Sequence, residues 1–189
     1  MSAGYARDPS LDSCGEPALP FARGNPGTTT LPQLSLHSPI GDISVSEESG
    51  AVVAVDWGWG RDQDATFLLR RARDQLHAYF DGELTEFDLP LAPAGTPYQQ
   101  RVWQALCAIP HGETRSYLDI AQIAGGSARS VGQANGRNPI PLIIPCHRVV
   151  ATTHLGGYSG GEGLATKRWL LALEARAQPL LQPIPSAAA

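Results

Sequence analysis

The chain has 189 residues, of which 42% are hydrophobic and 17% are charged. This length suits one domain of ordinary size or two small ones, and the composition can bury a core and excludes a disordered chain. No apolar run approaches the roughly 18 residues that span a bilayer, and the polar N-terminus lacks the hydrophobic region of a signal peptide, so we expect a soluble protein of the cytoplasm, or of the nucleus in a eukaryote.

The formal net charge of −4 is unevenly divided along the chain. Residues 1–94 hold 6 Arg against 14 Asp and Glu, a charge of −8, whereas residues 95–189 hold 8 Arg and Lys against 4 Asp and Glu, a charge of +4. A basic half within an acidic protein permits binding to an acidic partner such as DNA. So few cations predict weak binding with a modest dependence on salt.

The three cysteines, Cys14, Cys107 and Cys146, are an odd number, and none stands in a CxxC motif. The sequence therefore indicates neither a disulfide framework nor a zinc site of the usual spacing. Cys14 with His37 and His77 would form a ligand set without an evident fourth member. We expect no metal and no cofactor.

The first half of the chain predicts a small α/β domain over residues 31–92, after an irregular leader over residues 1–30 that is rich in Pro, Gly, Ser and Thr. "LSLHSPIGDISVS" and "AVVAVDWGW" predict two strands around a Gly/Ser turn. "DATFLLRRARDQLHAYFDG" predicts an amphipathic helix, and "FDLPLAPAGTP" predicts a strand that passes into a linker near residue 93. The apolar positions of the helix are Phe67, Leu68, Ala72, Leu76 and Tyr79.

The second half predicts mainly helices. "TPYQQRVWQALCAI" and "LATKRWLLALEARA" are amphipathic, and residues 178–189 are expected to be a flexible tail. Two short helices between them, capped by Ser116 and Ser127 and joined by a Gly-containing turn, form a helix-turn-helix pattern. Arg129 projects from the second of these helices, and small residues gather on it, at Ala128, Ser130, Gly132 and Ala134. Small side chains let a helix backbone approach a narrow surface closely.

Two motifs of other enzyme classes can be set aside. "GYSGG" fits the GxSxG turn of α/β-hydrolases, but that fold needs a histidine after the serine and none follows Ser159. "GGSARSVG" lacks the GK[ST] ending of a phosphate-binding loop. The glycines near Ser159 are better explained as a loop beside an active site.

Cys146 ends the apolar run "NPIPLIIPCHRVV", which predicts a buried strand that surfaces as Cys-His-Arg. A free cysteine is most often a small buried hydrophobe, but here His147 supplies an imidazole at its side. A working thiol needs a base of this kind, itself oriented by a carboxylate, for which Glu174 is the candidate. Neighbours on a strand face opposite sides, so His147 would reach Cys146 only through a bent backbone or a water.

These motifs together resemble the O6-alkylguanine–DNA alkyltransferase (methylated-DNA–protein-cysteine methyltransferase) family. "PCHRVV", with "GRNPIPLII" before it and "GGYSGG…KRWLLALE" after it, carries the resemblance, and "GTPYQQRVWQAL", "IPHGETRSY" and "ARSVGQANG" resemble the family's helix-turn-helix region in order and spacing. The match is close over residues 95–176 and looser before them. It implies an α/β (α+β) fold: a small N-terminal sheet-and-helix domain, and a mainly helical domain over residues 93–177 with a helix-turn-helix and an active-site strand.

The resemblance implies direct repair of O6-alkylguanine, and of O4-alkylthymine, in double-stranded DNA. Cys146 would take the alkyl group irreversibly, so that each molecule acts once. His147 would relay the thiol proton through water, and Glu174 would hold its ring. Asn138 would tie the helix-turn-helix to the active-site strand, and Tyr117 would lie at the DNA backbone and donate a proton to the departing base.

The resemblance also implies a minor-groove contact surface, with Arg129 entering the duplex in place of a flipped nucleotide. The expected DNA-facing residues are Ser116, Tyr117, Ala128, Arg129, Ser130, Gly132 and Gln133, and Ser130 stands where the family often has alanine. The expected base pocket comprises Asn135, Val149, Tyr158, Ser159 and Gly160. We expect a monomer without zinc, without the fused metal-bearing sensor domain of some relatives, and without a membrane partner. Cooperation between molecules along DNA stays open.

Three alternatives stay open at this point. One is a lesion binder without catalysis, although the alkyltransferase-like relatives of this kind lack the acceptor cysteine. Another is a transcription regulator that uses the same helix-turn-helix, and a third is a cysteine hydrolase. The first two share the DNA-binding surface with the repair hypothesis and differ from it in the chemistry of Cys146.

Overall fold

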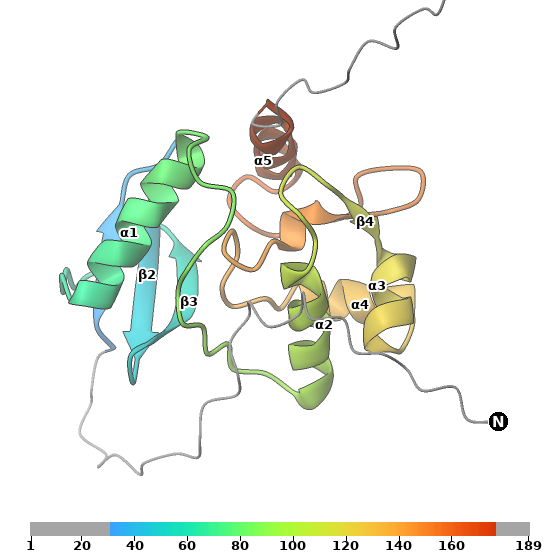
Figure 1. Cartoon of the computed structure of the whole chain (residues 1–189), viewed down its shortest axis with the longest axis horizontal. Helices are drawn as coiled ribbons and strands as arrows, with labels where there is room; N and C mark the ends of the chain where they lie inside the picture. Colours follow the sequence, from blue (N-terminus) through green and yellow to red (C-terminus); the bar gives the residue numbers. More distant parts are fainter. Residues whose placement is uncertain (1–30, 177–189) are drawn as a thin grey trace, which may run out of the picture.

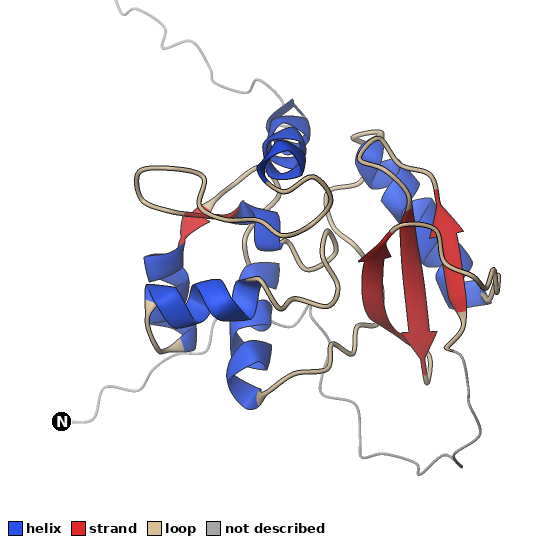
Figure 2. Ribbon diagram, turned by 180° about the vertical axis from the view of Figure 1, so that it is seen from behind, coloured by secondary structure: helices blue, strands red, loops and turns tan. Residues whose placement is uncertain are grey.

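The computed structural model describes residues 31–176, which form a sheet-and-helix part and a mainly helical part that lie side by side (Figure 1). Seen from behind, the three-stranded sheet with its one helix stands on one side and the remaining helices gather on the other (Figure 2). The first 30 residues, with Cys14, and residues 177–189 lie outside the described part, and so do the predicted leader and tail. No helix within residues 31–176 is long and apolar enough to span a membrane.

The sheet has three antiparallel strands in the order β1 (Gln33–Leu36), β2 (Ile43–Glu48) and β3 (Ala51–Trp57). The sequence predicted two strands here, and the first prediction was wrong: a turn divides that segment into β1 and β2. Pro39 and Gly41 make that turn, and Gly41 adopts a φ of 101°, which glycine reaches without strain.

Helix α1 (Phe67–Phe80) packs on the sheet, as predicted, but with a different buried face. Its N-cap is Thr66, which accepts a hydrogen bond from the Leu69 backbone N–H. Phe67, expected in the core, is 78% exposed because it lies about 200° around the helix from Leu69. The buried residues are Leu69, Ala72, Leu76, Tyr79 and Phe80.

The segment after α1 was predicted to be a strand, and this prediction was wrong. Leu91 makes only an isolated bridge with Val52, whose N–H donates to Pro90 O at 2.8 Å and whose carbonyl accepts from Ala92 N at 2.9 Å. Pro90 and Pro93 have no N–H to donate, so a longer ladder cannot form here.

The four helices predicted in the second half are present, as α2 (Pro97–Cys107), α3 (Tyr117–Ala124), α4 (Ala128–Asn135) and α5 (Leu164–Arg176). The first three each begin with a capping box, in which a Ser or Thr at the N-cap and the third helical residue satisfy each other's backbone N–H groups. Helices α3 and α4 form the helix-turn-helix and both pack on α2, where Trp103 Nε1 donates to Ala134 O at 2.9 Å.

The predicted active-site strand does not form. Residues 138–145 make a buried, tightly folded loop in which Ile144 N donates to Ile140 O at 2.9 Å and Leu142 has a φ of 74°. The chain then enters one turn of 3-10 helix, η2 (Cys146–Arg148), before the two-residue strand β5 (Val149–Val150), which pairs with β4 (Arg115–Ser116) in parallel. The prolines at 139, 141 and 145 explain the error, because they deprive the segment of alternate ladder donors.

Candidate active site

Cys146 is the first residue of the η2 turn and is 5% exposed. Its backbone N–H donates to Ile144 O at 2.8 Å, and the turn is closed by Arg148 N donating to Pro145 O at 3.0 Å. On a 3-10 turn successive side chains are about 120° apart, rather than on opposite faces as on a strand. Cys146 and His147 therefore do not face opposite sides, as they would on a strand.

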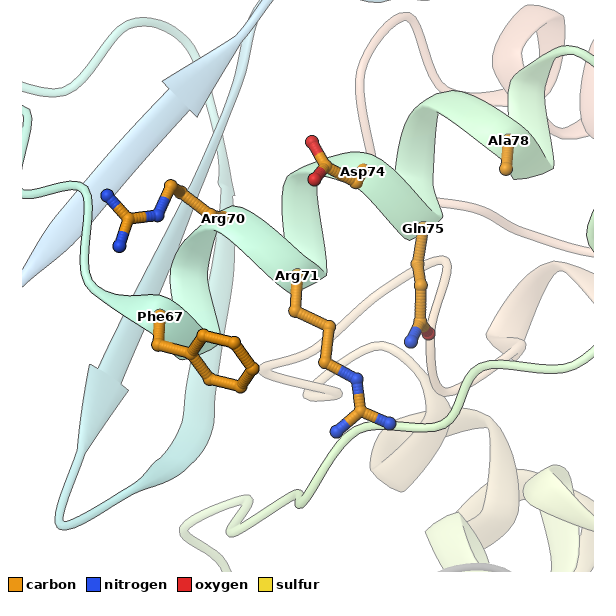
Figure 3. Close-up of a pocket in the computed structure, with 6 residues that line it drawn as sticks. All are labelled: Phe67, Arg70, Arg71, Asp74, Gln75 and Ala78. Atoms are coloured by element: carbon orange, nitrogen blue, oxygen red, sulfur yellow. The ribbon is translucent and has the colours of Figure 1, made fainter.

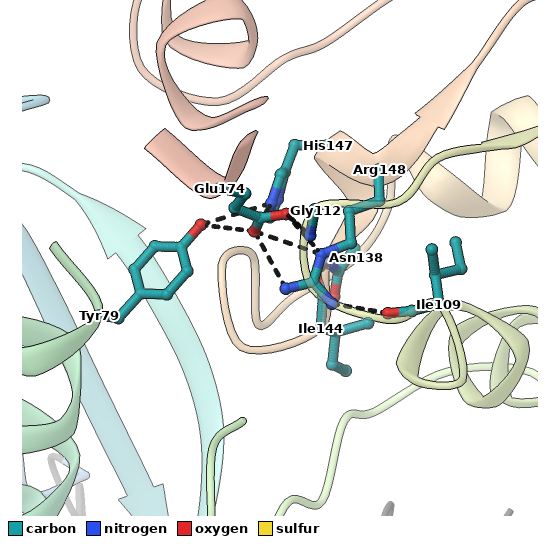
Figure 4. Close-up of polar contacts among 8 residues, drawn as sticks. All are labelled: Tyr79, Ile109, Gly112, Asn138, Ile144, His147, Arg148 and Glu174. Carbon is teal, nitrogen blue, oxygen red and sulfur yellow. Dashed lines mark hydrogen bonds and ion pairs between the residues drawn. The ribbon is translucent and has the colours of Figure 1, made fainter. Parts of the chain in front are cut away.

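His147 is fully buried and is held by the carboxylate of Glu174 on α5 (Figure 4). His147 Nε2 lies 2.7 Å from Glu174 Oε1, as expected from the resemblance. The same oxygen accepts from Tyr79 Oη at 2.8 Å and from Arg148 Nη2 at 3.0 Å. Glu174 therefore joins α1, η2 and α5 in one buried polar cluster.

The second oxygen of Glu174 is also bound. Oε2 accepts from Arg148 Nε at 2.9 Å and from the Gly112 backbone N–H at 3.1 Å, and Arg148 Nη1 donates onward to Ile109 O at 2.7 Å. Burial opposes the ionisation of Glu174, but the hydrogen bonds from His147 and Arg148 and the positive charge of Arg148 outweigh it and hold the pKa of Glu174 well below its usual range. Glu174 is an anion at neutral pH.

The ionisation of His147 is set by two opposing effects. Burial is the larger and lowers the pKa of His147, whereas the hydrogen bond and charge of Glu174 raise it. The imidazole is therefore neutral at neutral pH, and Nε2 carries its proton because it faces a carboxylate oxygen that can only accept. Nδ1 is left with a lone pair, and no described residue forms a hydrogen bond with it.

The thiol of Cys146 is protonated in the resting site. Burial raises its pKa, and the nearby polar side chains of Asn138 and Tyr158 and the charge of Lys167 offset this only in part. The thiolate is the nucleophilic form, so the thiol needs a base before it can react. A neutral imidazole on the next residue is such a base.

Asn138 and Asn135 fix the backbone around the thiol. Asn138 Nδ2 donates to Ile144 O at 2.8 Å, and Asn138 Oδ1 accepts from Ile140 N at 3.0 Å, so this side chain closes the loop that follows α4. Asn135 Nδ2 donates to Cys146 O at 3.2 Å, while its buried Oδ1 has no partner among the described residues. The helix-turn-helix is thereby bonded to the turn that carries the thiol.

Lys167 was missed in the sequence, although a lysine three residues before Leu170 and seven before Glu174 falls on the buried face of α5. It is fully buried, and its Nζ donates to Val149 O at 2.6 Å, Leu155 O at 2.5 Å and Gly157 O at 3.2 Å. Burial lowers the pKa of Lys167 to about 8. This one ammonium holds the loop that runs from β5 past the thiol.

A cavity of about 200 Å³ opens onto Cys146. Asn135, Ser159 and Gly160 of the expected base pocket line it, and Asn138 lines it too. The other two expected pocket residues, Val149 and Tyr158, are not in its wall. Val149 is buried, and its carbonyl is bound to Lys167. The far wall was not foreseen in the sequence: it comes from the end of β3, at Val55, Asp56 and Trp57.

A larger and more open hollow of about 520 Å³ lies on α1, over Arg70, Arg71 and the exposed ring of Phe67 (Figure 3). Arg71 is paired with Asp88 beside it. None of the residues that hold or face the thiol takes part in this hollow. Among residues 31–176 no group of three or more His, Cys, Asp and Glu could hold a metal ion.

The expected DNA-facing residues lie on α3 and α4. Ala128, Arg129 and Gln133 are exposed, and Gly132 is half-buried under the ring of Tyr117. The Ser130 hydroxyl is turned inward, 2.7 Å from Tyr98 Oη, and belongs to the capping box of α4. Ser116 caps α3 by accepting from Asp119 N, and Tyr117 is half-buried with its hydroxyl donating to Gly157 O at 3.5 Å.

The chain resembles known proteins along most of its described length. Residues 34–93 match the family model for the 6-O-methylguanine DNA methyltransferase, ribonuclease-like domain, and residues 97–176 match the model for the DNA binding domain of the same family. A crystal structure of Mycobacterium tuberculosis OGT in complex with DNA superposes with a TM-score of 0.70 at 44% identity, covering 78% of this chain and 95% of that chain.

Two curated relatives agree with these matches. The methylated-DNA–protein-cysteine methyltransferase of Mycobacterium bovis is 59% identical over 111 residues, which cover 57% of this chain and 66%, just under two thirds, of the relative. The protein of the same description from Mycobacterium leprae is 46% identical over 153 residues, which cover 74% of this chain and 90% of the relative. With both family models and this relative matched, the chain belongs to the 6-O-methylguanine DNA methyltransferase family.

Proposed function

We propose that the protein repairs O6-alkylguanine in double-stranded DNA by transferring the alkyl group irreversibly to Cys146. The observation that carries this proposal is the pair of neighbouring residues on η2: a buried, protonated thiol and a neutral imidazole whose Nε2 is held by Glu174 while Nδ1 has a free lone pair. This is a thiol with its base, and the family match supplies the substrate class.

The transfer requires few groups. His147 Nδ1 takes the thiol proton through an intervening water, the Cys146 sulfur attacks the alkyl carbon, and the bond from that carbon to O6 breaks. The electron pair passes to the guanine, which takes a proton from Tyr117 as it leaves. The products are S-alkylcysteine and guanine, and because a thioether is not hydrolysed, each molecule reacts once. O4-alkylthymine presents the same alkyl–oxygen bond and fits the same reaction.

The lesion must leave the duplex to reach the thiol. Cys146 lies at the bottom of the cavity, and rotating a base out of the stack costs roughly a few kcal/mol. Helix α4 offers a small-residue face and the exposed Arg129 for the minor groove, where an inserted side chain can take the place of the base. We propose that the protein acts as a monomer at each lesion.

The test is to mix the protein with a duplex that carries one O6-methylguanine and to weigh the protein afterwards. We expect a gain of one methyl group, confined to the peptide of Cys146, and no gain with an unmodified duplex or with Cys146→Ala. An unchanged mass together with tight binding to the lesion would instead identify a lesion binder. Unchanged mass with sequence-selective binding to intact DNA would identify a transcription regulator.

A further inference from the structure

Tyr79 brings a hydroxyl from the sheet-and-helix part of the molecule into the cluster around His147 (Figure 4). It is the next to last residue of α1 and is fully buried. Its ring packs against Phe80, Phe87 and His111, with ring centroids 5.5, 5.4 and 6.1 Å away. In the sequence it looks like one more apolar position of an amphipathic helix, and its hydroxyl has no role there.

The Tyr79 hydroxyl lies between the carboxylate of Glu174 and the imidazole of His147. Tyr79 Oη donates to Glu174 Oε1 at 2.8 Å and is 3.5 Å from His147 Nε2. Burial and the charge of Glu174 both raise the pKa of Tyr79, so this hydroxyl keeps its proton and remains a donor. Glu174 Oε1 thus accepts hydrogen bonds from His147, from Tyr79 on α1 and from Arg148.

Arg148 binds both oxygens of the carboxylate, and the Gly112 N–H binds Oε2. These contacts keep the carboxylate in place when the Tyr79 hydroxyl is removed, so the hydroxyl acts on His147 through the charge on Oε1. A hydrogen bond to a charged oxygen is directional and roughly twice as strong as one between neutral groups. Tyr79 is therefore placed to set the charge that Glu174 presents to His147.

We propose that Tyr79 is a positioning residue for the proton transfer from Cys146: its hydroxyl donates to Glu174 Oε1, the oxygen that faces His147 Nε2, and takes up part of the carboxylate's charge. Helix α1 thereby takes part in the reaction although it contributes no group that touches the alkylated base. The effect on the transfer rate rests on the proposed function, whereas the effect on the ionisation of His147 does not.

Whether the pKa of His147 rises or falls without the Tyr79 hydroxyl follows from the groups that face the imidazole. Glu174 stabilises the charged imidazolium, and Arg148 and Lys167 oppose it. Removing the Tyr79 hydroxyl leaves more negative charge on Oε1, so the pKa of His147 rises. Loss of the hydroxyl's own dipole acts the other way, but across 3.5 Å rather than 2.8 Å, and is the smaller effect. The groups packed around the pair are Tyr79 and His111 on one side, Cys146 and Arg148 on η2, Tyr158 in the loop, and Lys167 on α5.

The experiment compares Tyr79→Phe, which keeps the ring, with the control Phe80→Leu, which disturbs the neighbouring packing but removes no polar group. The pKa of His147 is measured by NMR titration of its ring protons, and the rate constant of methyl transfer is measured in single turnover across pH. We expect Tyr79→Phe to raise the pKa of His147 and to move the acid limb of the rate profile to higher pH. If that limb moves by about one pH unit, the rate constant on the acid side falls about tenfold. Phe80→Leu should lower the melting temperature without moving either the titration or the limb.

Two outcomes overturn the proposal. One is an unchanged or lowered pKa of His147 in Tyr79→Phe, and the other is a slower reaction with the acid limb in its original place, which would show that the hydroxyl serves packing alone. If the wild-type protein takes up no methyl group, the proposed function fails, and the NMR titration still decides the role of Tyr79.

Discussion

At the scale of single residues, the groups around the thiol and the group that would enter the DNA are held very differently. Glu174 is bound at both oxygens and Lys167 by three carbonyls, so neither can move without breaking several contacts. Arg129 is exposed on α4, and no described residue forms a hydrogen bond or ion pair with its guanidinium. A side chain that must insert into a stack of bases has to be free to leave its resting position, and Arg129 is.

Arg129→Ala should therefore affect duplex DNA and free base unequally. Without the inserted side chain the flipped state loses its replacement in the stack, so we expect repair of an O6-methylguanine duplex to slow by roughly tenfold or more, since unstacking costs a few kcal/mol. Reaction with free O6-benzylguanine, which needs no flipping, should keep its rate. The measurement is the single-turnover rate constant with each substrate, with the exposed Arg168→Ala as a matched loss of charge. Equal slowing with both substrates would show that Arg129 does not act as a wedge.

At the scale of elements, the sequence predicted the helices well because their ends are encoded locally. Ser116 and Ser127 are N-caps, and the side chains three residues later, Asp119 and Ser130, complete a capping box with them. The strands were predicted less well. A turn at Pro39 divides the first, and prolines prevent those at 87–93 and 138–145, although the apolar run of the latter is buried as expected.

The site was predictable only where residues are adjacent or match a known motif. Cys146 and His147 are adjacent in the sequence, and the carboxylate partner Glu174 could be inferred from the family resemblance. Lys167 could have been found, since a charged residue on the buried side of an amphipathic helix needs partners. Tyr79 and Trp57 could not, because their roles depend on how the two parts of the chain pack and no local pattern records that.

The loop after β5 is an element without repetitive structure, and its order depends on Lys167. In Lys167→Met the carbonyls of Val149, Leu155 and Gly157 lose their donor, so we expect a loss of roughly 1–3 kcal/mol in the free energy of unfolding. Amide hydrogen exchange should become faster in residues 150–160 before it does elsewhere. Arg168→Met, at the next and exposed position of α5, is the control. Unchanged exchange in this loop would mean that its own turns hold it.

At the scale of the whole molecule, the sheet and the helical part meet at the cavity. A Cβ on Gly160 would lie 2.6 Å from Trp57 Cζ2, so the glycine lets the indole of β3 lie directly on the loop that follows Tyr158. Trp57 and Gly160 therefore both line the cavity and form part of the contact between the two parts of the molecule.

Gly160→Ala should drive these two surfaces apart. We expect the free energy of unfolding in urea to fall by about 1–3 kcal/mol, as is usual for overpacking. In the Trp57→Ala background the same substitution should cost less, because the clash with the indole is gone and only the contact with Tyr158 Cε1 at 2.9 Å is left. Gly157→Ala is the matched control, since a Cβ there would meet no atom within 4 Å. A similar loss in both backgrounds would place the strain elsewhere than at Trp57.

The residues of the buried cluster around Glu174 lie far apart in the sequence, and this decides when the thiol becomes reactive during synthesis of the chain. Tyr79 and Glu174 are 95 residues apart, and Glu174 follows His147 by 27 residues. A chain is made from its N-terminus, so the cysteine and its imidazole emerge before the carboxylate that orients the base. Until α5 docks, the thiol has no oriented proton acceptor. If the protein reacts only once, as proposed, it therefore stays unreactive during its own synthesis, and the docking of α5 is the step that completes its reactive site.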